Sequence, residues 1–151
     1  MASNNTLLFP RKTYLSLTGQ APATMYKKDY LLKQLDDFFE AIARITGKLQ
    51  HNDLTGAEHE ITQDLSEDRI ENLLTAENLP APDYDYLKFQ AELLVLKWKL
   101  VQKKNLDTPD LQAKTVTTLQ KLIHSRPDQY DVRLHELLAE ITDAATRLTT
   151  L

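Results

Sequence analysis

Residues 83–104 read DYDYLKFQAELLVLKWKLVQKK, and their apolar side chains form two adjoining stripes. One stripe consists of Leu87, Ala91, Leu94, Trp98 and Val101. The other consists of Tyr86, Phe89, Leu93, Leu96 and Leu100. Only a narrow polar face of Lys88, Glu92, Lys99 and Lys103 is expected to be left for water. Both stripes advance in steps of three and four residues, the spacing of one face of an α-helix. A helix that is apolar over so much of its circumference needs cover on more than one side, so we expect it at the centre of the fold.

Helical periodicity also precedes this central segment. Apolar residues recur every three or four positions over residues 27–50, which predicts one long amphipathic helix. Asp53 and Ser66 are residue types that favour the N-cap position, and each precedes a shorter amphipathic stretch. Pro80 and Pro82 are expected to end the second of these stretches, and Asp83 is expected to cap the central helix.

Two further helices are expected after the central one. Thr108 and Pro109 combine a capping hydroxyl with a proline in the first turn, a strong helix start. Asp128 is expected to cap the last helix, with Tyr130 as the first residue of its apolar stripe. All connections are short, so successive helices are expected to lie antiparallel. The sequence therefore predicts an all-α fold, a compact bundle of about six antiparallel helices.

The first 24 residues have no helical period and are rich in Ser, Thr, Asn and Pro. Two interpretations stay open for residues 1–24: an irregular arm that packs residues 7–9 onto the helices, or an extension ahead of a translation start at Met25. The helical domain is expected to span residues 25–151. A signal peptide is not expected, because residues 13–20 are too few and too polar for its apolar core. No apolar run approaches the roughly 20 residues that span a membrane. The absence of cysteine fits a reducing compartment, so with no signal peptide expected a cytoplasmic location is predicted.

Composition and charge narrow the range of chemistry. The 151 residues include no cysteine, which excludes disulfides, thiolate metal sites and cysteine nucleophiles. The net charge of −4 is unevenly distributed. Residues 53–85 contain one basic and ten acidic residues, whereas residues 86–126 contain eight basic and three acidic ones. Either these regions attract each other within the fold, or one of them recruits a charged partner.

Two parts of the chain resemble tetratricopeptide-repeat hairpins. Asn52-Asp53 followed by Ala57 is similar to the turn of that repeat and its small residue early in the second helix. Leu119 and Leu122 followed by Pro127 are similar to its closing pattern. The chain has no regular 34-residue period, so the resemblance implies tetratricopeptide-like hairpins rather than a superhelical array.

A second resemblance starts at Met25. Asp29-Tyr30, followed by an aliphatic helix over residues 39–45, resembles the opening of an uncharacterised bacterial family of small all-helical proteins. The similarity covers about residues 25–145. It implies a helical, repeat-like fold and supplies no catalytic residue.

The histidines form no complete metal-binding motif. His59-Glu60 begins the zinc-protease pattern His-Glu-x-x-His, as does the pair at His135, but both lack the second histidine. His51 and His59 could meet across a helical hairpin and bind a metal with Asp53 or Glu60, although surface histidines without such a role are commoner. Nucleophile elbows and phosphate loops are also missing, so no catalytic residue, metal ligand or cofactor is predicted.

Two surfaces are candidates for binding. The candidate basic patch comprises Lys97, Lys99, Lys103, Lys104, Lys114 and Lys121. A nucleic-acid site usually has more arginine, exposed aromatic residues and a positive total charge, so nucleic acid is not the expected partner. The candidate interface comprises Tyr86, Phe89, Leu93, Leu96 and Trp98. Either neighbouring helices cover this apolar surface, or part of it binds a partner, most simply a second copy.

These observations favour a non-enzymatic helical interaction or scaffold protein that self-associates or binds another protein. A small metal- or ligand-binding helical protein or an enzyme is the alternative. A nucleic-acid-associated protein acting through the basic patch is the second alternative.

Overall fold

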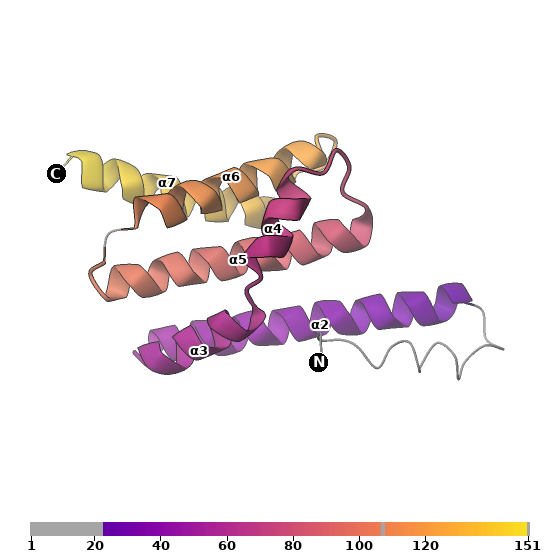
Figure 1. The fold of residues 1–151 in the computed structure, drawn as a ribbon, viewed down its shortest axis with the longest axis horizontal. Coiled ribbons are helices and arrows are strands. Elements are labelled where there is room, and N and C mark those ends of the chain that lie inside the picture. Colours follow the sequence, from indigo (N-terminus) through magenta and orange to yellow (C-terminus); the bar gives the residue numbers. More distant parts are fainter. Residues whose placement is uncertain (1–22, 107, 151) are drawn as a thin grey trace. The chain divides into compact units, whose positions relative to one another are not determined.

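The computed structural model describes residues 23–106 and 108–150. These residues form six α-helices and no strand, which confirms the predicted all-α class. The helices are α2 (Ala23–Gln50), α3 (Leu54–Asp64), α4 (Glu67–Leu74), α5 (Ala81–Lys103), α6 (Pro109–Ser125) and α7 (Val132–Thr150) (Figure 1). Among these described helices, none combines the length and hydrophobicity needed to cross a bilayer.

The contacts divide the chain into two units, Met1–Asp37 and Phe38–Leu151, and the boundary falls inside α2. Both hydrophobic clusters lie in the second unit. The two interpretations of residues 1–24 concern residues outside the described part of the chain, except that Ala23 and Thr24 begin α2.

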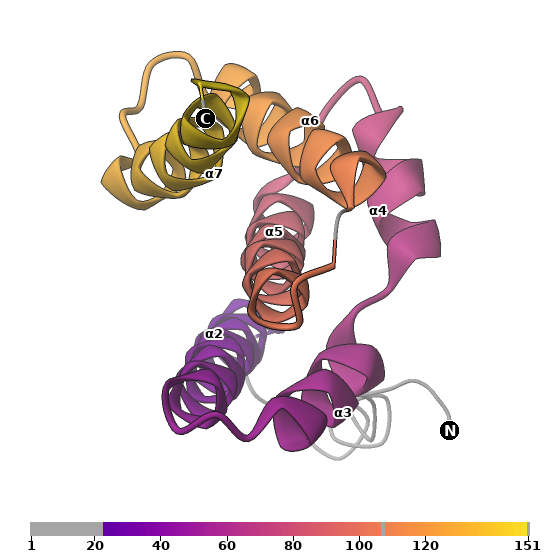
Figure 2. The same ribbon diagram turned by 90° about the vertical axis from the view of Figure 1, so that its left-hand side faces the viewer.

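Helix α5 is packed on two sides within the second unit. The buried residues of its first stripe pack with α4, α6 and α7, and they are Leu87, Ala91, Leu94 and Trp98. Those of its second stripe pack with α3 and with α2 from Phe38 onward, and they are Phe89, Leu93, Leu96 and Leu100. Figure 2, which looks nearly along α5, shows this helix between the two groups. The predicted central position of this helix is therefore confirmed. Burial of each leucine side chain stabilises the fold by about 1.5–3 kcal/mol.

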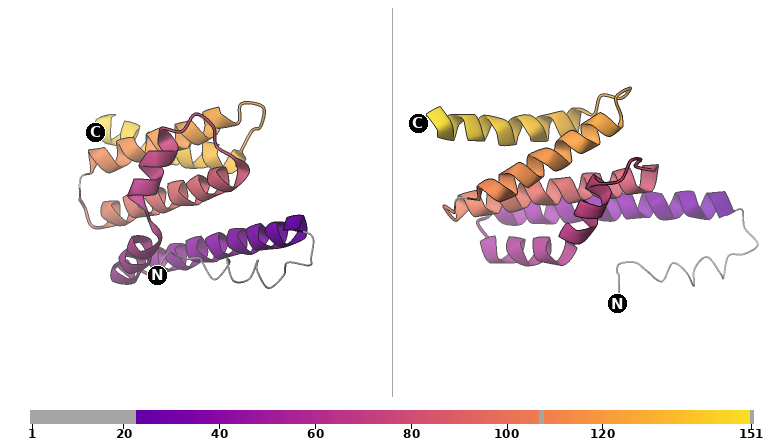
Figure 3. Two further views of the ribbon diagram at one scale, coloured as in Figure 1. Left: turned by 45° about the vertical axis from the view of Figure 1, so that its right-hand side comes forward. Right: turned by 45° about the horizontal axis from the view of Figure 1, so that its top comes forward.

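The short helix α4 runs across α5 rather than alongside it, as Figures 1 and 3 both show. It nevertheless contributes Ile70, which is fully buried, to the first cluster. The antiparallel pairing of all successive helices and the tetratricopeptide-like hairpins stay predictions.

Two asparagines in the left-handed region follow the two longest helices. Asn52 follows α2 with a φ of 61°, and Asn105 follows α5 with a φ of 60°. Asparagine adopts this region more readily than most residues, so both positions suit a change of chain direction. Asp53 then caps α3 as predicted, because its carboxylate accepts a hydrogen bond of 3.0 Å from the backbone N–H of Gly56.

The start of α5 differs from the prediction. Pro80 is its N-cap and the helix begins at Ala81, two residues before the expected cap at Asp83. Pro82 fits inside the first turn, because a backbone N–H there has no partner within the helix. Helix α4 ends at Leu74, well before the two prolines that were expected to end it.

The start of the last helix was also predicted too early. Helix α7 begins at Val132 rather than directly after Asp128. Asp131 acts at its start instead, since its Oδ1 accepts a 3.2 Å hydrogen bond from the backbone N–H of Leu134. Tyr130 precedes the helix and is 72% exposed, so its predicted place on the apolar stripe is wrong.

Candidate functional site

The candidate interface on α5 is covered by the chain's own helices. Four of its residues, Phe89, Leu93, Leu96 and Trp98, are buried in the two clusters. The ring of Phe89 stacks on that of Phe38, with centroids 4.2 Å apart. Tyr86 is half-buried and has the guanidinium of Arg69 4.0 Å from its ring centroid. Neighbouring helices therefore cover these side chains, which is the first of the two alternatives for this surface. A partner would have to open the fold to reach them.

Gln90 is a polar residue that the sequence interpretation missed. It is fully buried on α5, and its amide is hydrogen-bonded to the backbone where α3 ends and where the chain enters α4. Its Oε1 accepts a 2.9 Å hydrogen bond from the backbone N–H of Ser66, and its Nε2 donates one of 3.0 Å to the carbonyl oxygen of Asp64. Gln90 therefore holds this connection against the central helix. A single glutamine between two apolar stripes was the signal in the sequence.

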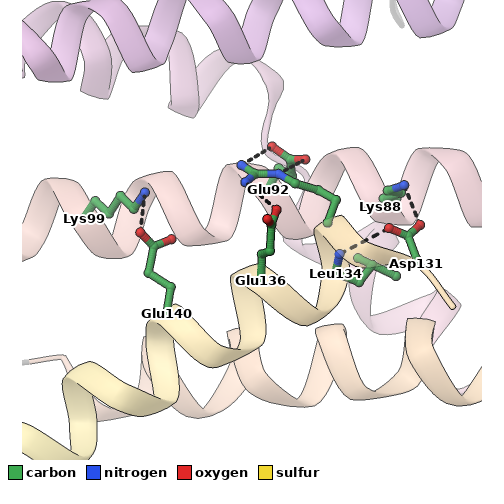
Figure 4. A network of polar contacts seen from close by, with 8 residues as sticks. Lys88, Glu92, Lys99, Asp131, Leu134, Glu136 and Glu140 are labelled. Atoms are coloured by element: carbon green, nitrogen blue, oxygen red, sulfur yellow. Dashed lines mark hydrogen bonds and ion pairs between the residues drawn. The ribbon is translucent and has the colours of Figure 1, made fainter.

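The narrow polar face of α5 meets α7 through a series of ion pairs (Figure 4). Lys88 Nζ lies 2.6 Å from Asp131 Oδ2, and Lys99 Nζ lies 3.1 Å from Glu140 Oε2. Between them, the guanidinium of Arg133 donates two hydrogen bonds to the carboxylate of Glu92. The face that was predicted to be left for water is thus partly covered. Pairs that stay partly open to solvent contribute only about 0–1 kcal/mol each, so these pairs orient α7 more than they stabilise it.

Four of the six lysines of the candidate basic patch pair with carboxylates. Lys104 Nζ lies 2.6 Å from Glu58 Oε1, and Lys114 Nζ lies 2.7 Å from Glu67 Oε1. Lys97 also reaches Glu67, and Lys99 pairs with α7. Glu58 and Glu67 belong to the acidic residues 53–85. These contacts therefore correspond to the first interpretation of the uneven charge, in which the acidic and basic regions attract each other within the fold.

Two of these ion pairs lower the pKa values of the carboxylates that take part in them. The hydrogen bond from Lys114 lowers the pKa of Glu67, and the hydrogen bond from Lys104 lowers the pKa of Glu58. Both carboxylates are thus held ionised by lysines that a nucleic-acid phosphate would otherwise contact. Lys103 and Lys121, the other two lysines of the patch, have no carboxylate partner in the described part of the chain.

The histidines do not assemble a metal site. Within residues 29–106 and 108–143, no group of three His, Asp or Glu side chains is placed to hold a metal ion. The Nδ1 of His51 lies 2.7 Å from the carbonyl oxygen of Gly47, one turn earlier in α2. His135 Nδ1 lies 2.9 Å from the carbonyl oxygen of Asp131, and its ring stacks on Tyr130. Both histidines thus make local contacts at a helix end.

A second cluster of charges joins α2 to α3. Arg44 Nε lies 2.8 Å from Glu60 Oε1, and Lys48 Nζ lies 3.3 Å from Glu60 Oε2. The hydrogen bond from Arg44 lowers the pKa of Glu60. Asp64 behaves oppositely, because burial raises its pKa more than the nearby Arg44 lowers it. Asp64 is also the last residue of α3, where the helix dipole disfavours a negative charge.

Substitution of Asp64 by asparagine should stabilise the protein at neutral pH. The folded-state pKa of Asp64 is raised, so its contribution to stability is present at low pH and is lost as the pH rises through that pKa. The difference in melting temperature between Asp64→Asn and the wild type is therefore expected to be positive at about pH 7 and to shrink toward about pH 3. Glu60→Gln serves as the control with the opposite sign, since Glu60 has a lowered pKa and is stabilising when ionised. A negative difference for Asp64→Asn at neutral pH would contradict this account.

Few large apolar side chains are more than half exposed in the described part of the second unit. They are Phe39 at 67%, Leu106 at 52%, Tyr130 at 72% and Val132 at 58%. The ring of Tyr130 already stacks on His135 with centroids 4.2 Å apart. Phe39 is the one aromatic side chain of this set without a polar group.

No family model, no curated protein and no solved structure matches the chain. The candidate sites therefore rest on the geometry of the chain itself.

Proposed function

We propose that this chain is a non-enzymatic helical interaction module that forms a homodimer through the face of α2 carrying Phe39 and Ala43. The exposed ring of Phe39 is the observation that carries this proposal. Ala43 lies one turn further along α2 and is also exposed. Residues four apart share one face of a helix, so the two side chains form a small apolar surface that begins at a large ring and ends at a methyl group.

A second copy suits this surface because the surface is complementary to itself. In a two-fold symmetric pair of α2 helices, Phe39 of each copy can pack over Ala43 of the other. A small residue at the crossing lets two helices approach closely. Burying one phenyl ring stabilises a complex by about 1.5–3 kcal/mol, and the symmetric contact buries two. Aromatic anchors of this kind dominate the binding energy of many interfaces.

The remaining candidate surfaces give less support to a partner. The apolar stripes of α5 are occupied by α2, α3, α4, α6 and α7. Most lysines of the basic patch are engaged with carboxylates of the same chain. The α2 face is thus the apolar surface that best suits a partner.

Sedimentation analysis of the full chain at about 100 μM tests the proposal. The expected mass is twice that of the 17.3 kDa chain. Phe39→Glu should give the monomer, because a carboxylate would be desolvated at the centre of the contact without a partner. Ala43→Glu should act in the same way.

Tyr130→Glu is the matched control, because Tyr130 is a similarly exposed aromatic residue on the connection before α7. This variant is expected to keep the mass of the dimer, and circular dichroism should show unchanged helicity in all three variants. A monomeric wild-type chain at the stated concentration would overturn the proposal. Dissociation by Tyr130→Glu but not by Phe39→Glu would do the same.

A further inference from the structure

A cleft of about 370 Å³ lies between the connection from α4 to α5 and the last turn of α6. The residues that line it are Glu77, Asn78, Leu79, Pro80, Lys121, His124, Ser125 and Arg126. Its volume is at the lower end of the range found for small-molecule sites. The cleft contains two permanent cations and one carboxylate, so its charge is positive while that of the whole chain is −4.

The two cations differ from most others in the protein. Lys121 Nζ donates a 2.7 Å hydrogen bond to the carbonyl oxygen of Ala76, and Arg126 donates one of 3.2 Å to that of Leu79. No carboxylate in the described part of the chain forms an ion pair with either of them, although most other lysines of α5 and α6 have one. Neither charge is therefore neutralised by a direct ion pair, although the guanidinium of Arg126 lies 4.6 Å from the ring centroid of Tyr84 and is close enough to Asp85 to act against the rise that burial causes in the pKa of that carboxyl.

Both cations also keep unused donors. An ammonium group has three N–H donors and a guanidinium has five, and each group uses one of them on the connection. The existing hydrogen bonds fix the two side chains beside the cleft, which reduces the entropy lost when a ligand binds. His124 and the hydroxyl group of Ser125 add further polar groups to the lining. Glu77 and the carbonyl end of α6 oppose an anion, but they leave the charge of the lining positive.

We propose that this cleft binds the oxyanion group of a small molecule, a phosphate or a carboxylate, through Lys121 and Arg126. Charge-assisted hydrogen bonds from lysine and arginine to such oxyanions are among the strongest polar contacts in proteins. The site is separate from the α2 face and does not depend on the homodimer.

Titration of the ¹⁵N-labelled full chain with sodium phosphate and, separately, with sodium acetate tests this site. The backbone amide signals of Asn78, Leu79 and Ser125 should shift and saturate with a dissociation constant of about 1 mM for one of the two anions. The anion that binds more tightly identifies the ligand group. Lys121→Met should weaken that binding about tenfold, whereas Lys121→Arg, which keeps the charge and the donors, should retain it.

Lys103→Met is the matched control, because Lys103 is an exposed lysine without a carboxylate partner that does not line the cleft. The Lys103→Met variant should bind the same anion with the dissociation constant of the wild type. Absence of saturable shifts with both anions would overturn the proposal even if Lys121→Met failed to fold. Equal weakening by Lys103→Met and Lys121→Met would overturn it as well, because general screening would then explain the shifts.

Discussion

Truncation of Leu94 to alanine is expected to lower the free energy of unfolding by about 3–5 kcal/mol. Leu94 is fully buried in the cluster that α5 forms with α4, α6 and α7. A leucine-to-alanine change in such a site loses the transfer free energy of the removed atoms and leaves a cavity that the neighbours fill only partly. Urea unfolding followed by circular dichroism measures the change, with the denaturant slope as a check on two-state behaviour.

Leu93→Ala should have an effect of the same size through different partners. Leu93 precedes Leu94 in the chain and is also fully buried, but it packs with α2 and α3 in the other cluster. If α5 is the shared core of one cooperative unit, both variants unfold in a single transition with similar losses. Lys103→Ala, on the exposed end of α5, should change the stability by less than about 0.5 kcal/mol. A loss below about 1 kcal/mol for either leucine would contradict the two-sided packing of α5.

Substitution of Gln90 by leucine is expected to destabilise the protein by about 2–4 kcal/mol, although leucine is the more hydrophobic residue. The change leaves the N–H of Ser66 and the carbonyl oxygen of Asp64 without their partner. An unpaired polar group in a buried position costs about 1–3 kcal/mol, and two groups are affected here. Urea unfolding again supplies the measurement.

Gln112→Leu provides the comparison for Gln90. The side chain of Gln112 donates one hydrogen bond of 3.1 Å to the carbonyl oxygen of Ile141, and it is only partly buried. Its replacement should lower the stability by no more than about 1.5 kcal/mol. Equal effects at the two glutamines would show that Gln90 has no special part in holding the connection between α3 and α4.

The sequence predicted the centre of this fold well, because periodicity reports directly on burial. The two stripes of α5 were separable from spacing alone, and each became the contribution of α5 to a different cluster. Asp53 was predicted as a cap for the same local reason, since an N-cap depends on residues within one turn.

The errors arose where a choice depended on distant residues. Several capping residues precede α7, and spacing does not show that Asp131 rather than Asp128 acts there; Asp131 also pairs with Lys88 of α5. Proline was taken as a stop, although Pro82 fits inside the first turn of α5.

The candidate sites were predicted less well than the fold. The apolar residues of α5 could be core or interface, and only the arrangement of the other helices distinguishes these cases. The partners of the lysines lie 40 or more positions away for Lys104 and Lys114, so no local pattern identifies them. The cleft beside Lys121 is likewise formed by two segments that are distant in the chain.

The two stripes of α5 also restrict how this protein can change its length. An α-helix turns by about 100° per residue, so one inserted or deleted residue within Leu87–Leu100 would rotate everything beyond it by that angle. Leucines of one cluster would then point toward the charged residues of α7, and lysines toward the core. The connections at Asn52 and Asn105 lie outside the helices, so an inserted residue there would not rotate one part of a helix relative to another. Natural variation in length should therefore collect at those turns and be missing from the central helix.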